Sequence, residues 1–94
     1  MKKNYCQNVI KELDSEFDTH MFIEKFILIY EKEYVELLYS HIDSKNGIFR
    51  AAHSVIGKFL SVNSSLLKIE KTDRAESENI KNYNNENQKW RKIK

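Results

Sequence analysis

Hydrophobic residues recur every three or four positions along the first sixty residues, which is the spacing of one face of an α-helix. The longest such stretch covers 19–42 and contains neither glycine nor proline. Its aromatic and aliphatic residues share one face at helical spacing: Phe26, Tyr30, Tyr34 and Leu37. The pattern therefore predicts one long central helix over about 19–42, with Asp18 or Thr19 as its N-cap.

Two shorter helical patterns flank the central one. Apolar residues at helical spacing predict a short amphipathic helix over 4–13, and a third helix over about 48–61 follows the loop at 43–47. Gly57 lies inside that third helix, where glycine lowers helix stability. The usual reason to keep a glycine there is close packing, so we expect a neighbouring backbone to approach Gly57.

The C-terminal third of the chain is polar. Residues 72–88 read as an Asn-rich loop or disordered segment, because they offer little apolar surface to bury. The basic segment 89–94 is predicted to return as an edge strand that packs Trp90 into the core and forms a short hairpin with 67–71. Alternatively, it is a basic tail whose aromatic and cationic side chains suit single strands, phosphate backbones or an acidic surface. We therefore predict a mainly α fold: a small three-helix domain at 1–71, followed by that loop and the C-terminal segment.

A second apolar column remains on the predicted central helix. Its members are seven residues apart, with one aromatic beside them: Met21, Leu28, Val35 and Ile42, with Tyr39. The first helix or the C-terminal segment would cover this column in a monomer. Alternatively, the column forms a seam for a partner helix or a second copy of the chain.

Composition sets only weak limits on function. The 94 residues carry 16 basic and 14 acidic side chains, a net charge of +2, so a nucleic-acid partner is neither required nor excluded. Of the basic residues, thirteen are lysine, whereas arginine is the residue that reads guanine edges. We expect a cytoplasmic protein, since the first residues lack the apolar segment of a signal peptide and no apolar run reaches membrane-spanning length.

The residues that usually carry chemistry are sparse. Cys6 is the only cysteine, and the histidines His20, His41 and His53 do not form a zinc-binding pattern with each other or with a carboxylate. The two glycines are far apart, so no phosphate-cradling loop is present. We therefore predict no catalytic residue, no metal, no cofactor and no small-molecule substrate, and hence a protein that is not an enzyme.

One stretch of the sequence indicates a specific function. Residues 56–69, IGKFLSVNSSLLKI, resemble the turn of a helix-turn-helix module, with Gly57 at the helix contact and a polar turn at Asn63. In such modules the second helix enters the major groove. The resemblance implies a set of DNA-contacting residues: Ser64, Ser65 and Lys68 at the bases, with Arg50 or Lys58 reaching phosphate.

Two functional hypotheses follow from these patterns. The first is a small non-enzymatic protein-interaction module, self-associating through the column of Met21, Leu28, Val35 and Ile42. The alternative is a helix-turn-helix or winged-helix-like DNA-binding regulator, in which 67–71 and 89–94 form the wing and the Asn-rich stretch forms its tip.

Overall fold

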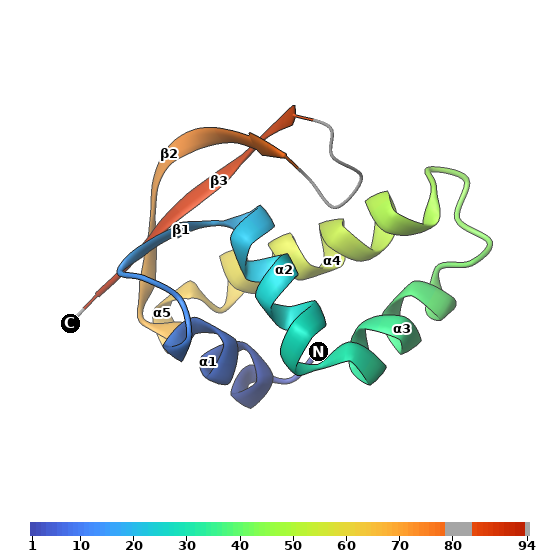
Figure 1. Ribbon diagram of the computed structural model, residues 1–94, viewed down its shortest axis with the longest axis horizontal. Coiled ribbons are helices and arrows are strands. Elements are labelled where there is room, and N and C mark those ends of the chain that lie inside the picture. Colours follow the sequence, from blue (N-terminus) through green and yellow to red (C-terminus); the bar gives the residue numbers. More distant parts are fainter. Residues whose placement is uncertain (79–83, 94) are drawn as a thin grey trace.

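The protein, analysed as a computed structural model, consists of helices packed beside a small antiparallel sheet (Figure 1). The structure describes residues 1–78 and 84–93. The elements follow in the order α1 (Lys3–Lys11), β1 (Glu16–Asp18), α2 (Thr19–Ile29), α3 (Glu31–Ser40), α4 (Ile48–Val62), α5 (Ser64–Leu67), β2 (Ile69–Glu78) and β3 (Asn84–Lys92). These five helices and three strands in the described ranges show that the predicted three-helix domain with a short hairpin is wrong.

The predicted central helix is two helices. Tyr30 leaves the helical conformation, with φ −123° and ψ 51°, so α2 ends before it and α3 begins after it. The Tyr30 ring is held by the Tyr5 ring at 4.5 Å between centroids, and its hydroxyl accepts a hydrogen bond from Asn8. Glu31 and Glu33 then occupy the first turn of α3, where carboxylates favour a helix N-terminus. Docking on α1 therefore breaks a helix that the periodicity alone continues.

Other helix predictions are confirmed. Asp18 is the N-cap of α2, and its Oδ1 accepts a hydrogen bond from the Met21 amide at 2.8 Å. The third predicted helix is α4, which extends to Val62. Gly47 precedes α4 with φ +95°, a conformation that glycine adopts without strain.

The sheet differs most from the sequence prediction. Its strand order is β1-β3-β2, so the C-terminal strand is central and not an edge strand. β1 pairs with β3 through Phe17 and Trp90, and β2 pairs with β3 from Ile69 to Glu78. The predicted pairing of 67–71 with 89–94 therefore covers only one end of a much longer hairpin.

The loop predicted over 72–88 is wrong for the residues on either side of its centre. Residues 72–78 belong to β2 and 84–88 to β3, because backbone pairing does not require the apolar alternation that this stretch lacks. Residues 79–83, at the centre of the predicted loop, and Lys94 lie outside the described residues.

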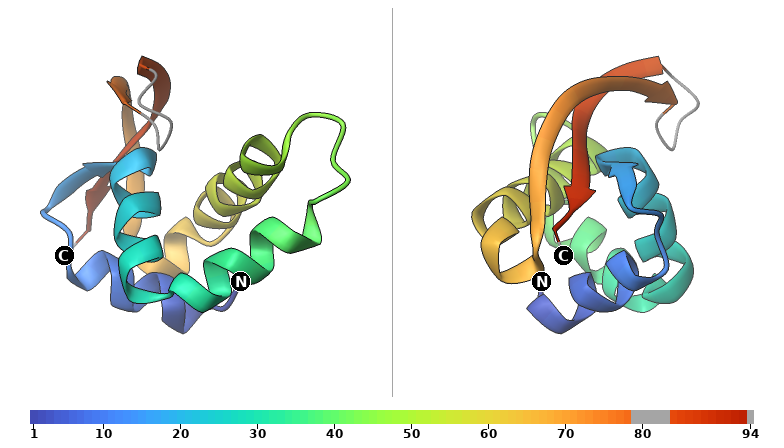
Figure 2. Two further views of the ribbon diagram at one scale, coloured as in Figure 1. Left: turned by 45° about the vertical axis from the view of Figure 1, so that its right-hand side comes forward. Right: turned by 90° about the vertical axis from the view of Figure 1, so that its left-hand side faces the viewer.

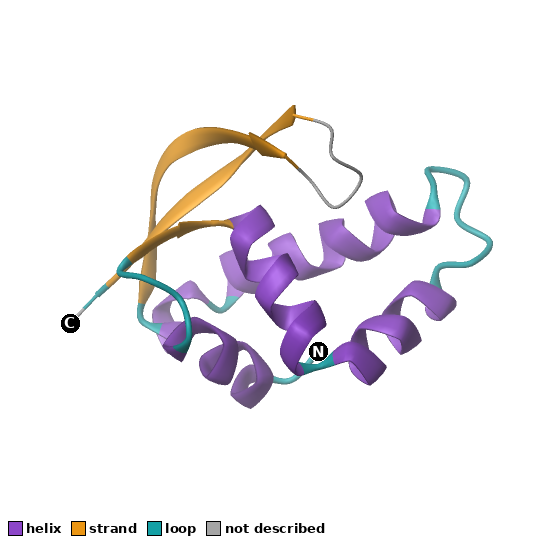
Figure 3. Ribbon diagram, in the orientation of Figure 1, coloured by secondary structure: helices purple, strands orange, loops and turns teal. Residues whose placement is uncertain are grey.

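The core lies where α1, α2, α4 and the sheet meet. Its largest fully buried side chains come from strands and helices alike: Trp90, Phe17, Phe22, Phe26, Ile56, Leu60 and Ile69. The β2–β3 hairpin curves over the start of α2, while α3 and α4 extend away from the sheet (Figures 2 and 3). The hairpin and α4 thus form two separate walls that share the base made by α2.

Candidate functional site

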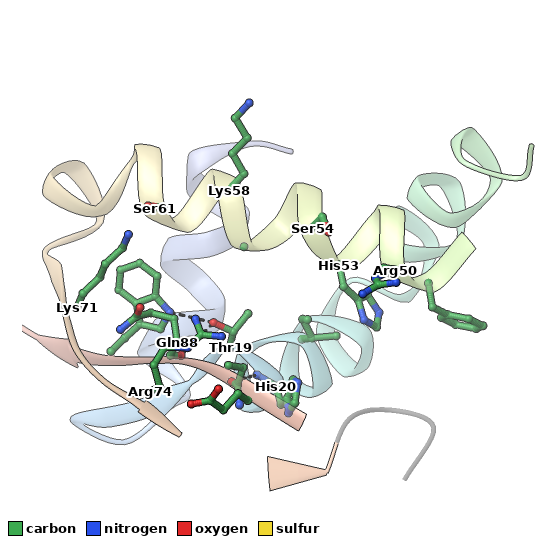
Figure 4. A pocket seen from close by; sticks show the side chains of 16 residues that line it. Thr19, His20, Arg50, His53, Ser54, Lys58, Ser61, Lys71, Arg74 and Gln88 are labelled. Carbon is green, nitrogen blue, oxygen red and sulfur yellow. Dashed lines mark hydrogen bonds between the residues drawn. The ribbon is translucent and has the colours of Figure 1, made fainter. Parts of the chain in front are cut away.

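A groove of about 690 Å³ lies between α4 and the β2–β3 hairpin (Figure 4). The start of α2 contributes Thr19, His20 and Ile23 to its lining. The remaining lining residues come from the two walls: Phe49, Arg50, His53, Ser54, Gly57, Lys58 and Ser61 from α4, and Lys71, Arg74, Glu86, Asn87, Gln88 and Trp90 from the hairpin.

The α4 wall follows from the amphipathic pattern of the helix. Its buried side chains are four residues apart, at Ala52, Ile56 and Leu60. Arg50 and Lys58 lie on the other side of the helix and are exposed. Burial of the apolar stripe therefore turns both cations outward, and the Lys58 side chain points away from the strands (Figure 4).

The hairpin wall depends on a break in the strand register. Lys71 is opposite Trp90 and Arg74 is opposite Gln88, so the four residues 71–74 of β2 span the three residues 88–90 of β3. In a regular strand, side chains three residues apart face opposite sides of the sheet. The register shift brings Lys71 and Arg74 to the same face, and both line the groove.

Buried hydrogen bonds fix the hairpin relative to α2. Asn87 is only 7% exposed; its Oδ1 accepts a bond from the His20 amide at 3.1 Å, and its Nδ2 donates to the Ala75 carbonyl at 3.1 Å and to Ser77 Oγ at 3.2 Å. His20 Nδ1 also lies 2.7 Å from Ser77 Oγ. Because these bonds join β2, β3 and the first turn of α2, they hold the hairpin at a fixed angle to the helices.

Trp90 and Thr19 form a second link across the base of the groove. The Trp90 indole donates to Thr19 Oγ1 at 3.1 Å, and the same hydroxyl donates to the Gln88 carbonyl at 3.1 Å. Trp90 is 1% exposed, which confirms the prediction that it packs into the core.

The opposite wall is tied to α3 through His53. Its Nε2 lies 2.7 Å from the Tyr34 hydroxyl. Burial raises the pKa of Tyr34 to about 12, so the phenol keeps its proton at neutral pH. The protonated hydroxyl can donate to a neutral imidazole nitrogen or accept from a protonated one. The pair therefore holds α4 against α3 in either state of His53.

Charged side chains without ion pairs are distributed unequally between the groove and the outer face of the hairpin. Four cations line the groove with one carboxylate: Arg50, Lys58, Lys71 and Arg74, with Glu86. No ion pair involves any of these five side chains in the part of the chain that the structure describes. On the other face of β3, Lys89 pairs with Glu16 at 3.7 Å and Arg91 pairs with Glu70. The positive charge without ion pairs therefore lies along the groove and, at Lys58, on the outer side of α4.

No family model, curated protein or solved structure matches the chain. The groove is therefore interpreted from its own geometry and charge.

The structure brings together only part of the predicted DNA-contacting set. Arg50 and Lys58 line the groove, whereas Ser64 and Ser65 belong to α5, a helix of four residues. Lys68 ends α5 in the left-handed conformation with φ 56°, and β2 follows at once. The predicted recognition helix over this stretch is therefore wrong, because sheet pairing from Ile69 onwards takes its place.

Sequence reasoning missed most of the groove. Arg74 and Gln88 fell in the predicted loop, where no apolar alternation indicates a strand, whereas Lys71 ended the strand predicted at 67–71 without a functional role. His20 and His53 were considered only as metal ligands. Among the residues that the structure describes, no group of three or more His, Cys, Asp or Glu side chains could hold a metal ion.

The second apolar column is exposed. Met21 is 48% exposed, Leu28 77%, Val35 55%, Tyr39 72% and Ile42 53%. Neither the first helix nor the C-terminal segment covers these side chains, which was one of the two alternatives. The break at Tyr30 divides the column between α2 and α3, so it is not a seam along one continuous helix.

The cysteine does not contribute to the groove. Burial raises the pKa of Cys6 to about 12, so the thiol is neutral at physiological pH, and it lies in the core away from the groove.

Within residues 1–78 and 84–93, none of the helices has the length and apolar character needed to cross a membrane.

Proposed function

We propose that the protein binds duplex DNA, with α4 in the major groove and the β2–β3 hairpin against the adjacent backbone. The observation that carries this proposal is the set of four cations without ion pairs, two from α4 and two from β2, that line one groove, with Lys58 on the outer side of α4. Phosphate contacts supply most of the affinity of DNA-binding proteins, and they require accessible Lys and Arg side chains.

The dimensions of α4 suit this role. Its 15 residues span about 22 Å, and the major groove of B-form DNA is about 12 Å wide and admits an α-helix. Arg50, Ser54 and Lys58 follow each other at intervals of four, so they form one exposed stripe along the helix. Such a stripe can contact base edges and phosphates while the buried face of α4 stays in the core.

The position of the hairpin supports the same function. It lies beside α4 as a wing lies beside a recognition helix in winged-helix modules, and its central strand is anchored to α2 through Asn87 and Trp90. This comparison concerns arrangement alone and is an analogy. It differs from the sequence hypothesis in assigning the major-groove role to α4.

Salt dependence of DNA binding tests the proposal. If the four cations each neutralise one phosphate, the logarithm of the affinity should fall with the logarithm of salt concentration with a slope of about −3.6. Fluorescence anisotropy with a labelled 30-base-pair duplex between 50 and 200 mM salt measures this slope. Absence of binding at low salt would rule out the proposal.

Duplex RNA of the same sequence is the matched control ligand. The major groove of A-form RNA is deep and narrow, so α4 cannot enter it. We expect weaker binding to duplex RNA than to duplex DNA at equal charge. Equal affinity for both would indicate adhesion to any polyanion instead of the proposed binding geometry.

We propose self-association with a second copy of the chain as a second candidate function, because the apolar side chains named above are exposed on α2, on α3 and in the turn after α3. A two-fold interface pairs a surface with itself, so charges of both signs within one patch can meet their opposites on the second copy. Lys32 and Glu36 are both exposed on α3 beside Val35 and Tyr39. The patch therefore offers complementary charges to a copy of itself.

Light scattering after size-exclusion chromatography at several concentrations checks this second candidate. We expect a dimer that dissociates in the Tyr39→Glu variant, because a carboxylate would be buried without a partner in the interface. Val62→Glu is the control, since Val62 is equally exposed, at 72%, but lies on α4. A monomer at every concentration would exclude self-association through this patch.

A further inference from the structure

We infer that a single sugar–phosphate strand of the bound duplex passes through the groove, and that Gly57 is where this strand comes closest to α4. The inference rests on the DNA-binding function proposed above and specifies how the groove is used. The major and minor grooves of a duplex are separated by one backbone strand. If α4 lies in the major groove and the hairpin lies beyond it, that strand must run between them.

The surroundings of Gly57 do not fit the expected structural role of this residue. Close packing was the expected reason for a glycine in this helix, yet a methyl group there would meet no neighbouring group within 4 Å. Gly57 faces the groove, between Ser54 and Ser61 on the same wall. A glycine that weakens a helix without packing against anything is explained by a ligand whose backbone approaches closely.

Charge on the two walls matches a phosphate strand. Arg50 comes from α4, whereas Lys71 and Arg74 come from β2, and the Lys71 side chain points from its strand toward α4 (Figure 4). A strand in the groove would therefore have cations on both sides. The side of the hairpin that carries the Lys89–Glu16 and Arg91–Glu70 pairs offers no such free charge.

The groove is also held open by its walls. Asn87 and Trp90 fix the hairpin to α2, and the Tyr34–His53 contact fixes α4 to α3. The first two contacts join the hairpin to the base of the groove, and the third joins α4 to α3. Movement of either wall toward Gly57 would therefore break hydrogen bonds. The space opposite Gly57 is therefore a persistent feature of the fold.

Filling this space without changing charge tests the inference. We expect Gly57→Leu to lower the affinity for the 30-base-pair duplex by about tenfold or more near 0.1 M salt, the effect of losing about one phosphate contact, and to make the salt slope shallower by about one unit. Leucine favours the helix and has open space before it, so the variant should fold. Gly57→Ala should raise the melting temperature, with a smaller loss of affinity.

Val62→Leu is the matched control, because Val62 is exposed on the same helix but does not line the groove. It should leave the affinity and salt slope unchanged. Ser61→Leu, on the groove wall, is the second variant and should reproduce the Gly57→Leu result even if the latter melts early.

The outcomes separate the two proposals. Wild-type DNA binding that persists unchanged in folded Gly57→Leu and Ser61→Leu would overturn the strand path and leave DNA binding intact. Failure of the wild-type protein to bind at low salt would overturn both.

Discussion

Replacing Trp90 with alanine should destabilise the domain by about 3–5 kcal/mol, the usual cost of removing a large aromatic side chain from a packed core. Trp90 is 1% exposed and belongs to the cluster that joins β3 to the helices. A domain of this size has a total stability of roughly 5–15 kcal/mol, so the variant should be partly unfolded near physiological temperature. The loss also leaves Thr19 without its indole donor.

Urea denaturation followed by far-ultraviolet circular dichroism measures the effect, since Trp90 is the only tryptophan and its fluorescence is lost with it. Tyr39→Ala is the control because it removes an aromatic side chain that is 72% exposed. Tyr39→Ala should change the stability by less than about 0.5 kcal/mol in the monomer. A loss below about 1 kcal/mol in Trp90→Ala would contradict the position of β3 at the centre of the fold.

The helices could be predicted where tertiary contacts agree with local periodicity. The apolar spacing in 48–61 identifies α4, and Asp18 identifies the start of α2. Tyr30 could not be recognised as a break, since its helical spacing is regular and the cause lies in its contacts with Tyr5 and Asn8 on α1. Such contacts link residues more than twenty positions apart and leave no mark in a local pattern.

Only the end of the hairpin at 67–71 and 89–94 could be predicted, because the rest of its two strands has polar faces. β2 reads IEKTDRAESE, in which only Ile69 is a large apolar residue, so the alternation typical of a half-buried strand is missing. Pairing with β3 satisfies its backbone instead. The bulge after Lys71 turns the side chains beyond it to the opposite face of the sheet. The regular alternation of side chains along a strand would have placed Lys71 and Arg74 on different faces, so their common position on one wall could not be predicted.

The sequence therefore indicated only the residues that α4 contributes to the candidate site. Arg50 and Lys58 could be named because the resemblance to a helix-turn-helix module implied that they reach phosphate. The hairpin residues enter the site through long-range pairing alone. The net charge of +2 was equally uninformative, because function depends on where the unpaired cations lie and not on their sum.

Neutralising the hairpin side of the groove should have the largest effect on DNA binding. In the Lys71→Gln/Arg74→Gln variant, two phosphate contacts are lost, so we expect an affinity about ten- to hundredfold lower near 0.1 M salt. The salt slope should become shallower by about two units, and the loss should be similar for unrelated DNA sequences, since phosphate contacts carry no sequence information. Anisotropy titrations with two unrelated duplexes measure both quantities.

Lys89→Gln/Arg91→Gln is the matched control for this prediction. It removes the same charge from the same hairpin, but from side chains that are paired with Glu16 and Glu70 outside the groove. Exposed ion pairs contribute little to stability, so this variant should fold and should bind DNA with a salt slope close to that of the wild type. Equal loss of affinity in the two variants would mean that overall charge governs binding. Only a loss confined to Lys71→Gln/Arg74→Gln agrees with a DNA strand bound between α4 and the hairpin.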